Sequence, residues 1–260
     1  MTKKITICAD DFALTPEISD AIVSLIQNKR ISAASCMTSM KHWQIDARKL
    51  LDLPVKADIG LHLNLTEPPF LILPGKFSLP ELILKSYLNY LNEKIIEQEL
   101  ETQLLKFQEA MGRLPDFLDG HEHIHVLPVI RNIVIHLYEK YFPNKNAYIR
   151  LPLTRKKSNF KSSVIHWIGA KKLGEALDQK QIPHNLSFEG AYSFDKADQF
   201  PILFASFLCS IESGGLVMCH PGKGQFERGP DRSVEYDYLM SDQYWQDLKQ
   251  ADVEVCRFFS

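Results

Sequence analysis

The chain has 260 residues, of which 45% are hydrophobic and 24% are charged. This composition is typical of a globular protein and excludes a disordered or collagen-like chain. With 30 Lys and Arg residues against 32 Asp and Glu residues, the net charge is −2, which argues against nucleic acid or an anionic membrane surface as the partner. No linker divides the sequence, so we expect a single domain spanning residues 1–260.

Membrane and export signals are not visible in the sequence. No apolar run approaches the ~20 residues that a transmembrane helix needs, and the first strand-like segment leads into Asp10 and Asp11, which a signal-peptide core would not tolerate. We therefore expect a cytoplasmic protein. The five cysteines show no C-x-x-C spacing, which fits a reducing compartment. Four lie in apolar, strand-like segments and are expected to be buried: Cys8, Cys36, Cys219 and Cys256.

Short apolar strands alternate with amphipathic helices along the chain. A strand at residues 5–9 is followed by a helix that begins at Thr15 and Pro16, an N-cap and a first-turn proline. Further strands are predicted at residues 32–38, 58–65, 117–119, 147–151, 186–188, 215–219 and 253–258. Further helices are predicted at residues 93–111, 128–141, 164–177, 200–211 and 242–250, with a proline-rich loop at 67–80 and a basic loop at 155–161.

This alternation predicts an α/β fold in which parallel strands are covered by outer helices. For a chain of this length we favour a (β/α) barrel, TIM-like but irregular or incomplete, over an open doubly wound sheet. The sequence contains neither G-x-G-x-x-G nor the P-loop motif, so nucleotide binding through those loops has no support.

Polar side chains gather where the predicted strands end, which is where parallel α/β folds carry their chemistry. Five of the nine histidines lie at such positions. The polar residues at strand ends are Asp10, Asp11, His62, Asp119, His121, His123, His125, Arg150 and His220. The other histidines lie on helical or loop segments and are expected to be structural or exposed: His42, His136, His166 and His184.

These residue types favour a metal site. Adjacent carboxylates such as Asp10 and Asp11 repel each other unless a cation lies nearby. In an extended segment, His121, His123 and His125 would project from one face at intervals of about 6.5–7 Å. Imidazoles beside carboxylates are typical ligands of divalent metals. No G-x-S-x-G motif supports a serine hydrolase instead.

Five blocks of the sequence, in order, resemble the YdjC-like family of carbohydrate deacetylases, which includes chitooligosaccharide deacetylases and hopanoid-biosynthesis-associated members. The blocks are Ala9-Asp-Asp-Phe12, Gly60-Leu-His-Leu-Asn-Leu-Thr66, Leu118-Asp-Gly-His-Glu-His-Ile-His125, Ile149-Arg-Leu-Pro152 and Cys219-His-Pro-Gly222. The segment Arg232-x-x-Glu235-x-x-x-Leu239 also resembles the family. One departure is Ala13, where the family usually has glycine.

The resemblance implies a barrel-like, often dimeric hydrolase of carbohydrate metabolism that removes acetyl groups from N-acetylated sugars with one divalent metal ion. Carried over, the metal ligands are Asp11, His62 and His123, and the catalytic base is Asp10; His121 or His125 are alternatives to His123. Ligand softness suits Zn²⁺, whereas the family is commonly associated with Mg²⁺, so both ions stay open.

The remaining roles follow from the chemistry of amide hydrolysis. The leaving amine must be protonated, by His220 or His125, and Arg150 is expected to orient Asp10 or to bind the substrate. Asp119 and Asn64 are predicted substrate contacts. Three aromatic residues are candidate sugar platforms, although packing roles are expected for them: Trp43, Phe70 and Tyr192. Alternative functions are another metal-dependent hydrolase, such as a phosphoesterase or amidohydrolase, or a sugar-binding protein with an inert site.

Overall fold

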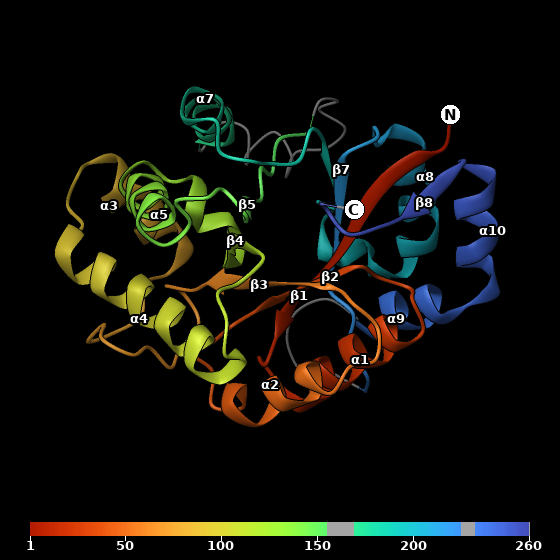
Figure 1. Cartoon of the computed structure of the whole chain (residues 1–260), viewed down its shortest axis with the longest axis horizontal. Helices are drawn as coiled ribbons and strands as arrows, with labels where there is room; N and C mark the ends of the chain where they lie inside the picture. The colour runs from red at the N-terminus through yellow and green to blue at the C-terminus, as the bar shows by residue number, and fades with distance from the viewer. Residues whose placement is uncertain (155–168, 225–231, 260) are drawn as a thin grey trace.

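The computed structural model describes residues 1–154, 169–224 and 232–259, in which strands and helices alternate along the chain (Figure 1). The strands are β1 (Lys3–Phe12), β2 (Ala33–Cys36), β3 (Asp58–Leu63), β4 (Phe117–Gly120), β5 (Tyr148–Ile149), β6 (Phe188–Glu189), β7 (Gly215–Cys219) and β8 (Val253–Val255). All of their pairings are parallel.

The sheet is an incomplete barrel. Its strand order is β5-β4-β3-β2-β1-β7-β6, and β8 pairs with the beginning of β1. On the open side, between β5 and β6, the two segments are joined by the bond from the N–H of Ile149 to the carbonyl of Pro183 at 3.0 Å and by the side chain of Asn185. Its Oδ1 accepts from the N–H of Leu151 at 2.8 Å, and its Nδ2 donates to the carbonyl of Leu151 at 2.9 Å. The α/β fold and the incomplete barrel predicted from the sequence are thus confirmed.

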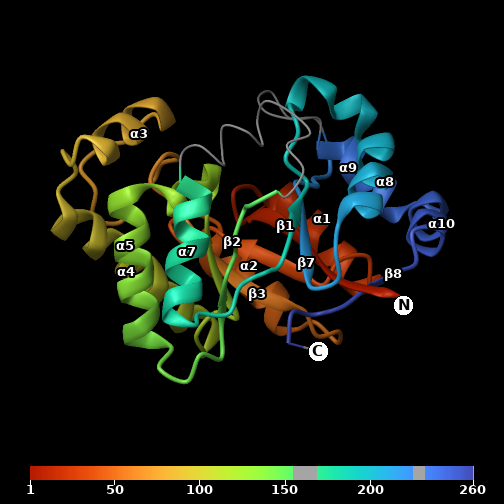
Figure 2. The same ribbon diagram turned by 90° about the horizontal axis from the view of Figure 1, so that it is seen from above.

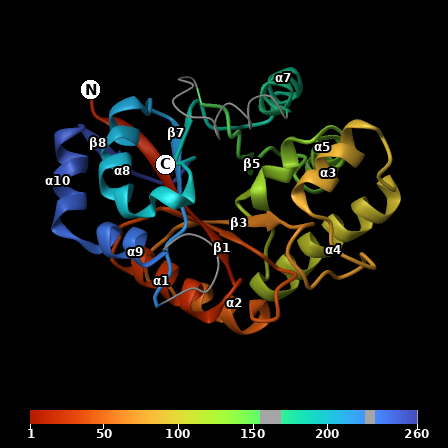
Figure 3. The same ribbon diagram turned by 180° about the vertical axis from the view of Figure 1, so that it is seen from behind.

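Helices surround the strands, as Figures 2 and 3 show from above and from behind. They are α1 (Pro16–Gln27), α2 (Trp43–Leu51), α3 (Leu79–Tyr87), α4 (Glu93–Met111), α5 (Pro128–Tyr141), α7 (Lys171–Lys180), α8 (Phe200–Ser210), α9 (Arg232–Met240) and α10 (Asp242–Gln250), with the 3₁₀ segments η1 (His121–Val126) and η3 (Phe194–Gln199). Among the helices of the described ranges, none has the length and apolar character to cross a membrane.

Three helices were missed by pattern alone. The buried faces of α2, α3 and α9 include polar residues, which interrupt the apolar period: Asp46 in α2, Ser86 in α3, and Arg232 and Glu235 in α9. The predicted basic loop at 155–161, His166 and the first part of the predicted helix at 164–177 lie outside the described residues. β1 runs beyond the predicted 5–9, so Asp10 and Asp11 lie within the strand rather than after it.

Burial of the cysteines follows the prediction with one exception. Cys8, Cys36 and Cys219 are buried, whereas Cys209 is exposed. Cys256 is only half-buried, contrary to expectation, because it follows the short outer strand β8, no residue of which is fully buried.

The amino ends of the central strands are covered by the C-terminal segment. Asp58, the first residue of β3, accepts from Arg257 Nε at 2.7 Å and from the N–H of Phe258 at 2.8 Å. The ring of Tyr148 stacks on Phe258 at 4.1 Å and on Phe117 at 4.8 Å between centroids. The C-terminal segment thus closes the amino end of the barrel. The polar residues predicted at strand ends lie at the opposite, carboxyl end.

Candidate metal centre and active site

A bulge in β1 places the two adjacent aspartates together. The register between β1 and β2 shifts between Ala9 and Phe12, so β1 accommodates one extra residue there. Asp11 has a φ of 67°, a left-handed conformation that costs a non-glycine residue about 1–2 kcal/mol. Successive side chains of a regular strand would point to opposite faces. Because of the bulge, Asp10 Oδ2 and Asp11 Oδ1 lie 3.9 Å and 3.5 Å from His62 Nε2.

Ala13 occupies a position whose backbone favours glycine. Its φ is 74°, in the left-handed region that glycine adopts without strain, and this explains why the resembling family usually has glycine there. Its N–H donates to Ser19 Oγ at 3.0 Å, and Ser19 donates to Asp46 Oδ2 at 2.6 Å. Ala13 thus adopts the left-handed conformation in spite of its Cβ.

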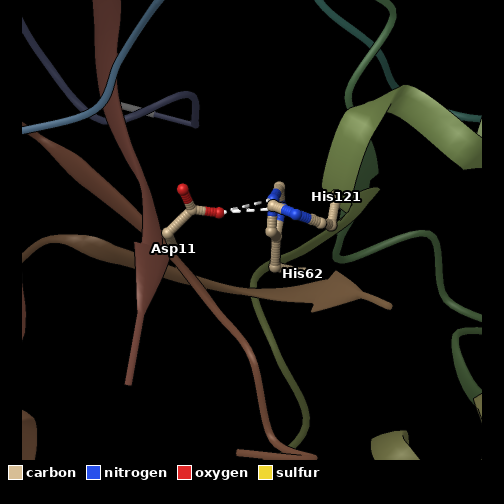
Figure 4. A group of neighbouring side chains, drawn as sticks. All are labelled: Asp11, His62 and His121. Carbon is tan, nitrogen blue, oxygen red and sulfur yellow. Dashed lines mark hydrogen bonds and ion pairs between the residues drawn. The ribbon is translucent and has the colours of Figure 1, made fainter. Parts of the chain in front are cut away.

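Asp11, His62 and His121 form the candidate metal site (Figure 4). Asp11 Oδ1 lies 2.9 Å from His121 Nδ1 and 3.5 Å from His62 Nε2, and the candidate donor atoms all lie within 4.8 Å of one another. One carboxylate oxygen and two imidazole nitrogens suit Zn²⁺ and other divalent ions. Only His121 is partly exposed, with 19% of its side chain accessible, so the site opens on its side.

The histidine run does not adopt the extended conformation that we expected. It forms the 3₁₀ turn η1, in which Glu122 and His123 have φ values of 53° and 59°. Gly120 permits this tight turn, because a Cβ there would lie 2.9 Å from Ile124 Cγ1 and 3.1 Å from His125 Nδ1. The three imidazoles therefore do not share one face.

The turn brings His121, rather than His123, to Asp11 and His62. The ring of His123 instead lies edge-on to Phe188, with centroids 5.7 Å apart. The geometry therefore favours His121 over His123 as the third ligand, and the choice within the histidine run stays a prediction.

His62 is held in one orientation by Asp119 and Ser35. Its Nδ1 donates to Asp119 Oδ1 at 2.6 Å, and Ser35 donates to the same oxygen at 2.5 Å. Burial alone would lower the pKa of His62, but Asp119 and Asp10 raise it to about 10. A carboxylate on the far nitrogen is the usual way to orient a metal-binding histidine. Ser35 was not predicted as a site residue, because a single serine within a short apolar strand belongs to no recognisable motif.

Arg150 holds Asp10 through both carboxylate oxygens. Its Nη1 and Nη2 donate to Asp10 Oδ1 and Oδ2 at 2.6 Å and 2.8 Å, and its Nη1 lies 3.0 Å from Asp119 Oδ2. The side chain is completely buried, which favours the orienting role over the substrate-binding role predicted for it. Burial raises the pKa of Asp10, although Arg150 and His62 oppose the shift.

His125 is unsuited to donating a proton to a substrate. Its Nε2 lies 2.9 Å from the carbonyl of Arg150, and because a carbonyl only accepts, Nε2 carries the proton of a neutral ring. Burial lowers the pKa of His125 to about 4. His125 therefore holds the backbone of Arg150, and His220 is left as the candidate acid.

His220 follows β7 at the end of the strand next to β1. Cys219 pairs with Ala9, which places His220 beside Asp10 along the edge of the sheet. The N–H of His220 donates to Glu235 Oε2 at 2.6 Å. Glu235 and Arg232 belong to the segment that resembles the family, but the sequence alone predicted no function for either residue.

Arg232 contacts the candidate metal site in a way that sequence spacing could not reveal. Its Nη2 donates to Asp11 Oδ2 at 2.6 Å, and Asp11 Oδ1 is the oxygen that faces the two imidazoles. Burial would raise the pKa of Asp11, but the charge of Arg232 and the interaction with His121 hold it well below its usual range. The two partners are 221 positions apart in the sequence.

The two predicted substrate contacts have other partners. Asn64 is buried, and its Oδ1 accepts from the N–H groups of Thr66 and Glu67 at 3.1 Å and 2.9 Å. Its Nδ2 donates to Ser39 Oγ at 3.1 Å and to the carbonyl of Glu67 at 2.5 Å. Its amide therefore shapes the turn after β3. Asp119 is equally buried and orients His62.

Of the three candidate sugar platforms, one remains accessible. Trp43 is buried and stacks on Phe107 with centroids 5.5 Å apart. Tyr192 is buried and donates to Glu235. Phe70, in the proline-rich loop, is half-buried and has an accessible surface. Trp43 and Tyr192 thus have the packing roles expected for them.

Three of the remaining histidines lie apart from the cluster. His42 precedes α2, and His184 Nδ1 lies 2.9 Å from the carbonyl of Ile182. The exposed His136 lies 3.4 Å from Glu97. These positions agree with the structural or exposed roles predicted from their surroundings.

Comparison with known proteins gives one family and several fold relatives. Residues 4–250 match the family model described as YdjC-like protein. A carbohydrate deacetylase of Danio rerio is 28% identical over 204 residues, which is 70% of this chain and 60% of that protein. A carbohydrate deacetylase of Mus musculus is 27% identical over 166 residues, which is 58% of this chain and 51% of that protein. The matched region thus spans about half to three-fifths of these relatives.

Two solved structures extend the comparison to the fold. An Enterococcus faecalis V583 protein, described as a candidate cellobiose-phosphate cleavage protein, has a TM-score of 0.74 and 18% identity, covering 100% of this chain and 98% of its own. A family 4 carbohydrate esterase from Streptomyces lividans, in complex with acetate, has a TM-score of 0.50 and 8% identity, covering 97% of this chain and 91% of its own. At these identities the likeness shows the fold alone.

Proposed function

The chain belongs to the YdjC-like protein family, and from that premise we propose that it is a metal-dependent carbohydrate deacetylase, which hydrolyses the amide of N-acetylated sugars. The observation that carries the proposal is the arrangement of Asp11, His62 and His121 beside Asp10. Relatives named carbohydrate deacetylase support the substrate class.

The residues at the site fit a divalent cation. Asp11, His62 and His121 would hold it, and the set of one carboxylate and two imidazoles leaves coordination positions open. When bound, the ion would activate a water molecule and polarise the acetyl carbonyl. Asp119 fixes the tautomer of His62, and Arg232 occupies the second oxygen of Asp11. Zn²⁺ and Mg²⁺ are both candidates.

Asp10 and His220 would move the protons. Asp10 Oδ2 lies 3.9 Å from His62 Nε2, so this oxygen faces the cluster and is placed to accept the proton of the attacking water. Arg150 holds the carboxylate through both oxygens. His220, at the end of the neighbouring strand, would give a proton to the leaving amine of the sugar.

A two-metal phosphoesterase is less well supported by the same region. Such enzymes hold two ions about 3.5–4 Å apart. A second group of potential ligands does exist, formed by Cys8, Asp10 and Asp119. However, Arg150 Nη1 lies 2.6 Å from Asp10 Oδ1 and 3.0 Å from Asp119 Oδ2. A guanidinium therefore already occupies the position that a second cation would need. An inert sugar-binding site would have no use for a base oriented in this way.

The direct test is an acetate-release screen over N-acetylated mono- and oligosaccharides, on metal-stripped protein and again with Zn²⁺ or Mg²⁺ restored singly. We expect acetate release that depends on the restored ion. Release of phosphate from sugar phosphates, hydrolysis of cyclic amides, or sugar binding without acetate release would contradict the proposal. The homodimer and the cytoplasmic location stay predictions.

A further inference from the structure

The first turn of α9 contacts the candidate active site at two points. Arg232 and Glu235 are three residues apart, which places them on the same face of a helix. Arg232 binds Asp11 Oδ2 at 2.6 Å, and Glu235 Oε2 accepts from the N–H of His220 at 2.6 Å. One helical turn therefore contacts both the metal-binding aspartate and the loop that carries the candidate acid.

The same turn fixes the backbone on both sides of Pro221. The N–H of Gly222 donates to the carbonyl of Arg232 at 3.0 Å, and Glu235 holds the N–H of His220. Proline has no N–H to donate. The N–H groups of His220 and Gly222 therefore both bind α9, which restricts the conformations open to His220.

Glu235 is an unusual residue for a purely structural position. Its side chain is completely buried, and its second oxygen accepts from the hydroxyl of the buried Tyr192. Burial raises the pKa of Glu235 to about 7. A buried carboxylate destabilises a fold relative to a well-packed apolar residue of similar volume. A carboxylate that bonds the backbone of a candidate acid is therefore better explained by that bond than by packing.

We propose that Glu235 is a positioning residue, which sets the imidazole of His220 against the leaving amine by holding the backbone N–H of His220. This inference rests on the proposed deacetylase function and adds a determinant of its proton-transfer step. Glu235 has no contact with substrate in this role and acts only through His220.

Three variants separate positioning from packing. Glu235→Leu removes both acceptors at similar volume, whereas Glu235→Gln keeps an acceptor for the N–H of His220 and a donor for Tyr192. Tyr238→Phe is the matched control, because Tyr238 is buried on the same helix and donates to Asp247 at 2.7 Å, away from His220. Each variant is assayed for acetate release and metal affinity.

We expect kcat of Glu235→Leu to fall about 100-fold, as for a misplaced acid, with KM changed less than about threefold. Glu235→Gln should restore kcat to within about fivefold of the wild type, and Tyr238→Phe should leave it unchanged. Metal affinity should be the same in all variants. If Glu235→Leu does not fold, Glu235→Asp, which withdraws the carboxylate by one methylene, should show the loss of kcat. The proposal is overturned if Glu235→Leu folds and keeps the wild-type kcat, or if Glu235→Asp, used in its place, does so.

An NMR readout keeps this test distinct from that of the proposed function. In protein labelled with ¹⁵N-histidine and held above pH 7, where Glu235 is ionised, the His220 amide should lie downfield because of its charge-assisted bond. It should move upfield in Glu235→Leu and stay in place in Tyr238→Phe, and the pKa of the His220 ring should change with it. Wild-type protein that releases no acetate refutes the deacetylase function. A His220 signal unmoved by Glu235→Leu refutes the positioning role, whatever the activity.

Discussion

The two ends of the barrel use buried charge in opposite ways. At the amino end, Asp58 accepts from Arg257 and from one backbone N–H, and aromatic rings cover the remaining space. At the carboxyl end, Asp10 and Asp11 lie side by side, and each is bound by an arginine: Arg150 binds both oxygens of Asp10, and Arg232 binds the oxygen of Asp11 that does not face the histidines. The first arrangement closes the barrel, whereas the second keeps carboxylate oxygens directed at His62.

This difference shows where stability and activity should separate. Removing a group at the amino end should lower the free energy of unfolding and leave turnover intact. Removing a group at the carboxyl end should lower turnover far more than stability. The variants of Asp10, Asp58 and Phe258 test that contrast directly, whereas those of Glu235 and Glu122 measure what buried charge and a left-handed turn cost at the carboxyl end.

The largest effect is expected from Asp10→Asn. An amide cannot accept the proton of the attacking water, so kcat should fall about 10³-fold, while the metal ligands stay in place. The matched control is Asp58→Asn, which alters another buried carboxylate bonded to an arginine but should leave kcat within about twofold. Steady-state acetate release and metal titration measure both. Near wild-type turnover in Asp10→Asn would mean that the base lies elsewhere.

A pH-dependent loss of stability is expected from Glu235 at the carboxyl end. Its pKa rises from the usual 4.5 to about 7 on folding, so the folded state binds this proton more tightly than the unfolded state. Stability should therefore fall as pH rises from about 4.5 to about 7, by about 3 kcal/mol, and then level off. Urea unfolding of wild type and Glu235→Gln measures it, since glutamine does not titrate. Parallel pH curves for the two proteins would exclude the buried, titrating carboxyl.

At the amino end, Phe258→Ala should lower the free energy of unfolding by about 2 kcal/mol, because Tyr148 loses one of its two stacking partners. Turnover should not change at temperatures where the variant is folded. Phe259, whose side chain is 54% exposed, is the comparison: it meets Tyr148 and Phe258 only edge-on, so Phe259→Ala should cost less than Phe258→Ala, about 1 kcal/mol or below. A loss of kcat in Phe258→Ala would break the separation of the two ends.

The smallest effect concerns the turn that presents His121. Glu122 is exposed and has a φ of 53°, so Glu122→Gly should raise the free energy of unfolding by up to about 1 kcal/mol. Glu122→Ala keeps the Cβ and should give no such gain. Thermal unfolding compares the two variants. If Glu122→Gly is instead less stable than the wild type while Glu122→Ala is not, the left-handed conformation of Glu122 costs little free energy.

Much of the site could be predicted because polar residues interrupt apolar strands. Asp10, Asp11, His62 and Arg150 were singled out in this way and lie together in the structure, since parallel strands bring their carboxyl ends to one edge. The role of His220 stays a prediction. The side chain of Asn185 forms hydrogen bonds with the backbone of Leu151 on the open side of the sheet. Hydrophobic periodicity cannot predict such side-chain contacts.

The errors share a cause in local backbone geometry. Alternation treats a segment as regular, but Gly120 and the left-handed Glu122 and His123 turn the histidine run through a 3₁₀ segment. The bulge at Asp11 is equally invisible to periodicity. Arg232 was missed for another reason, since its partner lies 221 residues away and only the folded chain brings them together.

The most direct test of the metal centre compares His121→Gln with His123→Gln. Zn²⁺ and Mg²⁺ are titrated into the metal-stripped wild type and into both variants, and the bound ion is counted in each. We expect one bound ion in the wild type and in His123→Gln, and at least about tenfold weaker binding in His121→Gln. Wild-type affinity in His121→Gln, together with lost binding in His123→Gln, would contradict the site formed by Asp11, His62 and His121.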